Sequence, residues 1–122
     1  MNENPIDAVE QYELGLYYIT KYDDKKAEYW IKKAAEQGYG EAQNELGSCY
    51  LNGALVLKDL EKAVYWYTKA AEQGHAGGQY NLGLCYGKGN GVQRDLEKAV
   101  YWVTKSAEQG DEDAKKILAQ LA

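Results

Sequence analysis

Apolar residues recur on one face of a helix along most of the chain. Over residues 42–50 they stand at positions i, i+4, i+7 and i+8, and a second apolar stripe runs over residues 63–71. Gly53 follows the first stripe and Gly74 the second, and glycine suits the left-handed conformation that ends helices. Asp59 is expected to cap the start of the second helix. Because no segment alternates with period two, the pattern predicts helix pairs and no strands.

This helix pair recurs with a fixed period. Lys-Ala-Ala-Glu-Gln-Gly occupies residues 33–38 and 69–74, and Lys-Ser-Ala-Glu-Gln-Gly occupies residues 105–110, so the spacing is 36 residues both times. The same interval separates Trp30, Trp66 and Trp102. A strict period of this size is typical of a repeat protein, in which one helical unit is stacked on copies of itself.

The repeats cover nearly the whole chain. We expect a single repeat domain over residues 1–122, with units at about 10–41, 42–77 and 78–113 and a C-terminal capping helix at 114–122. The second and third units align without gaps and share 21 of 36 residues. The first unit is four residues shorter between Tyr18 and Ala27, which predicts a clipped loop between its two helices.

Glycine recurs in the middle of the first helix of each unit, at Gly15, Gly47 and Gly83. A glycine inside a helix costs about 1 kcal/mol relative to alanine, so a compensating gain is expected at each position. Close approach of the second helix supplies such a gain. We expect Ala63 and Ala99 to lie opposite these glycines.

The unit Ala-x-x-x-Leu-Gly-x-x-Tyr at residues 42–50, followed by Lys-Ala-x-x-Trp-Tyr-x-Lys-Ala-Ala-Glu-Gln-Gly at 62–74, resembles the Sel-one-like repeat. That family is similar to the tetratricopeptide repeat but has a longer loop between its helices. Leu55 departs from the pattern, because it stands where the third unit has the loop glycine Gly91.

The resemblance implies an all-α fold, a right-handed α-α superhelix (solenoid) whose first helices line a concave face. It also implies an adaptor or scaffold that holds other proteins, or, in bacteria, an immunity partner of a toxin or a host-interaction factor. A hydrolase activity, as attributed to some related repeat proteins, and a fragment of a longer solenoid are the alternatives.

Charge and composition narrow the partners. The formal net charge of −5 disfavours nucleic acid and anionic membranes, since phosphate binding requires clustered Lys and Arg. No apolar run is long enough to span a membrane, and the first residues lack the pattern of a signal peptide. We therefore expect a cytoplasmic, monomeric protein whose partner is a protein or a peptide.

Helical phase selects the residues that point away from the paired helix and into the concave face. They are Tyr12, Leu16, Ile19, Asn44, Ser48, Leu51, Asn52, Tyr80, Leu84, Lys88 and Lys116. Exposed apolar residues in a groove favour recognition, although packing against a neighbouring turn is an equal alternative. Some related repeats grip a terminal carboxylate, but the corresponding positions are Tyr12, Leu16, Glu45 and Asn81, which include no cation.

Catalytic and metal-binding patterns are weak. The chain has two serines, Ser48 and Ser106, and one histidine, His75, which is expected in an exposed loop. Cys49 and Cys85 stand one period apart, which predicts two reduced, buried thiols rather than a disulfide. We expect no enzyme activity, no cofactor and no metal.

The repeated Glu-Gln pair remains unexplained by the sequence. Glu36, Glu72 and Glu108 lie near helix C-termini, where negative charge is unfavourable. The lysine three residues before each glutamate is expected to pair with it. No role for the following glutamine emerges.

Overall fold

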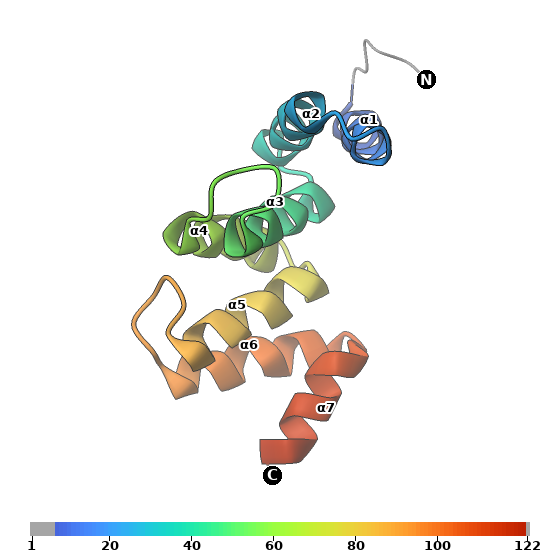
Figure 1. The fold of residues 1–122 in the computed structure, drawn as a ribbon. Coiled ribbons are helices and arrows are strands. Elements are labelled where there is room, and N and C mark those ends of the chain that lie inside the picture. Colours follow the sequence, from blue (N-terminus) through green and yellow to red (C-terminus); the bar gives the residue numbers. More distant parts are fainter. Residues whose placement is uncertain (1–6, 122) are drawn as a thin grey trace.

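The computed structural model describes residues 7–121, which form helices and no strands (Figure 1). The helices are α1 (Ala8–Thr20), α2 (Asp24–Glu36), α3 (Gly40–Asn52), α4 (Leu60–Glu72), α5 (Ala76–Lys88), α6 (Leu96–Glu108) and α7 (Glu112–Leu121). The predicted capping helix begins two residues earlier than expected, because Asp111 caps it by accepting a hydrogen bond from the Ala114 N–H at 2.9 Å. The end of that prediction, residue 122, lies outside the described range.

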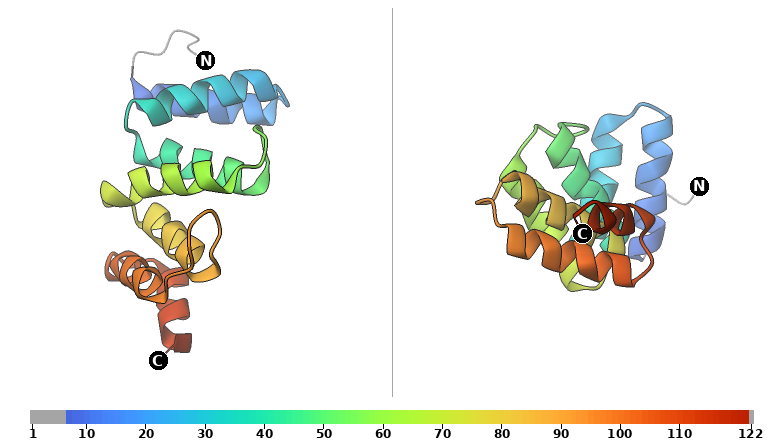
Figure 2. Two further views of the ribbon diagram at one scale, coloured as in Figure 1. Left: turned by 90° about the vertical axis from the view of Figure 1, so that its left-hand side faces the viewer. Right: turned by 90° about the horizontal axis from the view of Figure 1, so that it is seen from below.

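The helices pack as three pairs, α1 with α2, α3 with α4 and α5 with α6, and the pairs stack in one column that ends in α7 (Figure 2). Within each pair the chain reverses direction. Between pairs, α2 packs on α3 and α4 packs on α5, and α3 also touches α5. The first helices, α1, α3 and α5, therefore follow the inner side of the column, and α2, α4 and α6 follow the outer side.

Local caps define where the helices begin and end. Asp7, Asp23, Asp59 and Asp95 each accept a hydrogen bond from the backbone N–H three residues later, as predicted for Asp59. Gly53 ends α3 in the left-handed conformation at φ +70°. Gly74 follows α4 with φ +90°, so both predicted stops are confirmed.

The mid-helix glycines lie against the paired helix, as expected from the free-energy cost of glycine inside a helix. A Cβ atom at Gly15 would lie 2.7 Å from Ile31 Cγ1, one at Gly47 would lie 2.7 Å from Tyr67 Cδ1, and one at Gly83 would lie 2.6 Å from Val103 Cγ2. The prediction that Ala99 lies opposite is confirmed for its carbonyl, which would lie 3.1 Å from a Cβ atom at Gly83, whereas the nearest atoms to Gly47 belong to Tyr67 and not to Ala63. The side chain that covers each glycine belongs to the residue four positions later, one helical turn onward.

A chain of carboxamides, in which Gln11, Gln43 and Gln79 are buried, joins the units and accounts for the repeated glutamine. Gln73 Nε2 donates to Gln43 Oε1, and Gln43 Nε2 donates to Ala35 O at 3.1 Å. The next unit repeats the arrangement through Gln109, Gln79 and Ala71 O. In the first unit, Gln37 donates to Gln11 in the same way. We call the pairs Gln11–Gln37, Gln43–Gln73 and Gln79–Gln109, with their carbonyl acceptors, the glutamine chain.

The expected pairing of Lys33 with Glu36, and its equivalents in later units, was wrong. The ammonium groups instead lie over tyrosine rings: Lys33 over Tyr29, Lys69 over Tyr65 and Lys105 over Tyr101, at 5.7, 5.2 and 5.3 Å from the centroids. The tyrosine and the lysine of each pair are four residues apart on an outer helix, a spacing that places the lysine beside the ring.

The long loops before α4 and α6 carry different residues, Leu55 and Gly91, at one position with a left-handed backbone. Gly91 has φ +73°, and a Cβ atom there would lie 2.2 Å from Leu60 O. Leu55 takes the same left-handed conformation, at φ +69°, and its side chain packs against both apolar core clusters. Burial of this leucine therefore offsets a backbone conformation that L-residues rarely adopt.

Replacing Gly83 by alanine should destabilise the protein, because the added methyl group meets Val103 and the Ala99 carbonyl, which lies 3.1 Å away. Overpacking costs about 1–3 kcal/mol and outweighs the gain of about 1 kcal/mol in helix propensity. Gly87→Ala, in the same helix, is the control, since its Cβ would lie 3.6 Å from Ala99 Cβ, an ordinary contact. Urea unfolding should show a loss for Gly83→Ala only; equal effects would contradict the close-contact explanation.

Replacing Gln79 by methionine should lower the free energy of unfolding by about 1–3 kcal/mol, because Gln109 and the Ala71 carbonyl lose their partner at almost constant side-chain volume. Gln93→Met, in an exposed loop position, is the control. The two variants are compared by thermal and urea unfolding. If Gln79→Met were as stable as Gln93→Met, the glutamine chain would not hold the units together.

Candidate binding surfaces

The inner side of the column carries two of the predicted tyrosines, each beside carboxylates. The Tyr12 ring lies edge-on to Tyr39 at 5.5 Å and its hydroxyl hydrogen-bonds to Glu45. Burial, helped by Glu45 and Glu41, raises the pKa of Tyr12 to about 12. Tyr80 lies in a similar setting two units later, where burial and then Asp113 and Asp111 raise the pKa of its hydroxyl.

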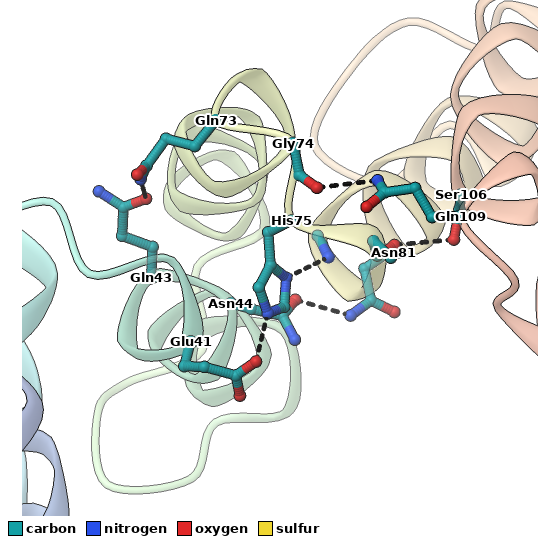
Figure 3. Close-up of polar contacts among 11 residues, drawn as sticks. Glu41, Gln43, Asn44, Gln73, Gly74, His75, Asn81, Ser106 and Gln109 are labelled. Carbon is teal, nitrogen blue, oxygen red and sulfur yellow. Dashed lines mark hydrogen bonds and ion pairs between the residues drawn. The ribbon is translucent and has the colours of Figure 1, made fainter.

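A polar cluster lies between α3 and the start of α5 (Figure 3). Asn81 Nδ2 donates to Asn44 Oδ1 at 2.9 Å. His75 is the N-cap of α5, and its Nδ1 accepts from the Gly78 N–H at 2.9 Å. Because Nδ1 accepts, the proton of the neutral ring is on Nε2, which donates to Glu41 Oε1 at 2.7 Å. His75 therefore lies in the connection between α4 and α5, as expected, but it is half-buried and hydrogen-bonded instead of exposed.

Several predicted inner-face residues are held by the fold. Ser48 Oγ and Tyr67 OH form a hydrogen bond of 2.8 Å, so Ser48 faces the paired helix and its assignment to the concave face was wrong. Tyr12, Ile19 and Leu51 pack against the apolar core, and Asn44 is bonded to the neighbouring unit through Asn81. Packing within the fold therefore accounts for part of the surface of these four side chains, and the rest stays accessible, since none is fully buried.

The other predicted residues keep surface available. Leu16, Tyr80 and Leu84 are half-buried, while Asn52, Lys88 and Lys116 are exposed. Leu84 and Lys88 also line a hollow of about 290 Å³ at the C-terminal end of the column. The hollow is the one place where predicted residues meet a cavity among those found in the described part of the chain.

This C-terminal hollow is apolar. Its lining comes from α5, α6 and α7, namely Gly83, Leu84, Gly87, Lys88, Leu96, Ala99, Val100, Val103 and Ile117. Leu96 and Val100 are 57% and 43% exposed. One unit earlier, the counterpart of Val100, Val64, is 9% exposed because it packs in the core. The hollow therefore lies where an outer helix is no longer fully covered by a following unit.

Sequence reasoning missed Leu96, Val100 and Ile117, because it considered only the first helix of each unit. The alignment of units contained the clue. Leu60 and Val64 recur as Leu96 and Val100, but only α7 follows Leu96 and Val100 among the described helices, whereas a full helix pair follows Leu60 and Val64.

The reactive side chains are engaged or shielded. Cys49 and Cys85 are buried free thiols, as predicted, and burial raises the pKa of each to about 11. Ser106 is fully buried and donates to Ala76 O at 2.8 Å. Between residues 7 and 121, no group of three or more His, Cys, Asp or Glu side chains could hold a metal ion. None of the described helices combines the length and apolarity needed to span a bilayer.

The Sel1 repeat model matches residues 11–39, 40–75 and 76–111. The chain belongs to the Sel1 repeat family. Solved Sel1 repeat structures are similar over most of its length, which confirms the predicted right-handed α-α superhelix. Proteins of this family are generally protein–protein interaction modules. No curated protein matches the chain significantly.

Three solved structures illustrate the similarity. The crystal structure of a Sel1 repeat protein from Oxalobacter formigenes is 40% identical, with a TM-score of 0.89, over 93% of this chain and 89% of that one. A protective antigen of uropathogenic Escherichia coli with an SLR fold is 42% identical, with a TM-score of 0.86, over 88% of this chain and 24% of that one. Helicobacter pylori cysteine rich protein B is 32% identical, with a TM-score of 0.79, over 90% and 88%.

Replacing His75 by alanine should cost about 1 kcal/mol of stability, because the N–H groups at the start of α5 lose their cap. His75→Asn is the matched variant: its side chain caps helices well but does not reproduce the bond to Glu41. Thermal unfolding should therefore place His75→Asn close to the wild type and His75→Ala below it. Equal losses in both variants would assign the stability to the Glu41 contact instead of the cap.

Proposed function

We propose that this Sel1 repeat chain binds a polypeptide partner along its inner face, and that the C-terminal hollow receives an apolar side chain of that partner. The hollow carries the proposal. Its lining is apolar except for Lys88, whose aliphatic stem can lie along an apolar wall while the ammonium stays in water. Leu84 belongs both to this hollow and to the inner helix α5, so the two surfaces are continuous.

The inner face supplies polar contacts beside this apolar anchor. Tyr80 is half-buried on the same helix as Leu84, four residues before it, so both side chains lie on one face of α5. Tyrosine offers a large apolar ring with a polar tip, which suits positions that lose water on binding. Asn52, Lys88 and Lys116 are exposed along the same side of the column and form its polar rim.

The reactive groups support a binding role over catalysis. Ser48 is bonded to Tyr67, Ser106 is fully buried, and the single histidine, His75, caps a helix. A nucleophilic serine needs a base within hydrogen-bond reach, and neither serine bonds to His75. We therefore propose a non-catalytic adaptor, scaffold or regulatory partner, with toxin immunity or host interaction as the specific roles to examine.

Partner binding should depend on the inner side of α5. A partner captured from cell extract and then purified is titrated by calorimetry against the wild type, Tyr80→Ala and Leu84→Ala. Each variant should weaken the dissociation constant roughly tenfold or more, as expected for residues at the centre of an interface. Their helical circular dichroism and melting temperatures should stay near those of the wild type.

Tyr101→Ala is the control, because Tyr101 is a 53%-exposed tyrosine on the outer helix α6. Unchanged affinity in Tyr80→Ala and Leu84→Ala would discard the inner-face assignment. A loss of affinity confined to Tyr101→Ala would place this partner on the outer side.

A further inference from the structure

The outer helices carry a repeated aromatic set that the inner-face function does not use. In α4, Tyr65 lies edge-on to Trp66 with ring centroids 5.1 Å apart, and Lys69 lies over the Tyr65 ring. In α6, Tyr101 and Trp102 repeat this geometry at 5.0 Å, with Lys105 over Tyr101. Tyr65 and Tyr101 are both 53% exposed, although nothing in the stack requires an exposed ring there.

Each set forms one wall of a notch between neighbouring units. The first notch, of about 320 Å³, is lined by Ala35, Glu36, Gln37, Gly38, Gln43, Tyr65, Trp66 and Lys69. The second, of about 280 Å³, is lined by Ala71, Glu72, Gly74, Gln79, Tyr101, Trp102 and Lys105. We call these two hollows the outer notches. Neighbouring units meet where the outer helix of one packs on the inner helix of the next, α2 on α3 and α4 on α5, and no contact of similar extent joins the described outer helices to one another.

The buried glutamine at the floor of each notch already has hydrogen-bond partners within the protein. Gln43 already donates to Ala35 O and accepts from Gln73, and Gln79 does the same one unit later. Gly38 and Gly74 leave the rim open, since a Cβ atom at either would meet nothing within 4 Å. Recognition therefore depends on the aromatic walls.

The walls offer aromatic faces, hydrogen-bond donors and no net charge. Within the described residues, the indole N–H groups of Trp66 and Trp102 have no acceptor. Each notch has one carboxylate, Glu36 or Glu72, and one ammonium, Lys69 or Lys105, so their charges balance. A ligand suited to this lining is neutral, supplies carbonyl acceptors and presents flat apolar groups to the rings.

We propose that the outer notches bind a proline-rich segment of a partner protein in the polyproline II conformation. Proline rings pack against exposed Tyr and Trp faces, and an indole N–H donates to a carbonyl of the segment. Such a segment has no internal hydrogen bonds and no proline N–H, so its carbonyls are free and it adds no donors. It is also extended before binding, which lowers the entropy lost on association.

The spacing of the notches fits such a segment. Adjacent packed helices lie about 8–10 Å apart, so equivalent points on α4 and α6, which are separated by α5, lie roughly 16–20 Å apart. Polyproline II rises 3.1 Å per residue, so about six residues, or two turns, connect the notches. A longer proline peptide can therefore fill both notches at once, whereas a very short one fills only one.

Decaproline is the probe for this proposal, followed by calorimetry and by the fluorescence of the three tryptophans. We expect saturable binding to the wild-type protein at up to about 1 mM peptide, a range in which weak module–peptide contacts are measurable. Tetraproline should bind roughly tenfold more weakly, because it reaches one notch only. The double variant Tyr65→Ala/Tyr101→Ala should weaken decaproline binding roughly tenfold or more.

Tyr29→Ala is the matched control. Tyr29 has the same exposure, the same edge-on tryptophan at 4.9 Å and the same lysine contact, but no unit precedes α2 within the described residues to form a notch. It should leave decaproline affinity unchanged. An equal loss in Tyr29→Ala would show that exposed tyrosines bind the peptide without notches, which would overturn the proposal.

Two further peptides test whether the outer notches bind other kinds of extended chain. A glycine–serine peptide of the same length should not bind, and decalysine should bind no better than decaproline, because the notch carries no net charge. Tighter binding of decalysine, or failure of decaproline to saturate, would overturn the proposal. The proposed inner-face function is tested independently, because Tyr80→Ala should not alter decaproline binding.

Discussion

The glutamine chain is the constraint on which the arrangement of units depends. A buried carboxamide must satisfy its donor and its acceptor together, since an unpaired buried polar group costs about 1–3 kcal/mol. Gln43 meets this demand only when the end of α4 and the end of α2 both lie within hydrogen-bond reach. Apolar packing alone tolerates small rotations between units, whereas directional hydrogen bonds restrict them. Gln43 and Gln79 also line the outer notches, so the same bonds hold the floor of each notch in place.

The two ends of the column differ for physical reasons that follow from the same packing. Each later unit packs on the outer helix before it through a small buried residue at an equivalent position, namely Ala42, Gly78 or Ala114. The contact at Gly78 is tight, because a Cβ atom there would lie 2.7 Å from Ala70 Cβ. The first unit has Glu10 at this position. Near the other end Leu96 and Val100 are exposed, so that end of the described column carries an apolar surface.

The cost of glycine inside a helix predicted the close contacts at Gly15, Gly47 and Gly83. Periodicity was sufficient to predict the helix pairs and their caps, because these depend on residues near one another in sequence. It was insufficient where a side chain reaches across to another element. Ser48 and Leu84 hold the same helical phase, yet Ser48 bonds to the Tyr67 hydroxyl while Leu84 lines a hollow. The residue on the paired helix determines which of the two occurs, because the counterpart of Tyr67 is Val103, which has no hydroxyl group to bond. His75 and the glutamine chain were missed for the same reason.

Repetition within the chain separates two kinds of surface. Thr20, Asn52 and Lys88 differ from unit to unit at one exposed position of the first helix, whereas Tyr29, Tyr65 and Tyr101 are identical and exposed. A lysine over an exposed ring contributes about 0.5–1 kcal/mol, which gives each tyrosine a modest structural reason to persist. That gain is equal in all three units. A notch beside the ring is present only where another unit precedes it. The notch, and not the ring, therefore distinguishes a binding role from a stabilising one.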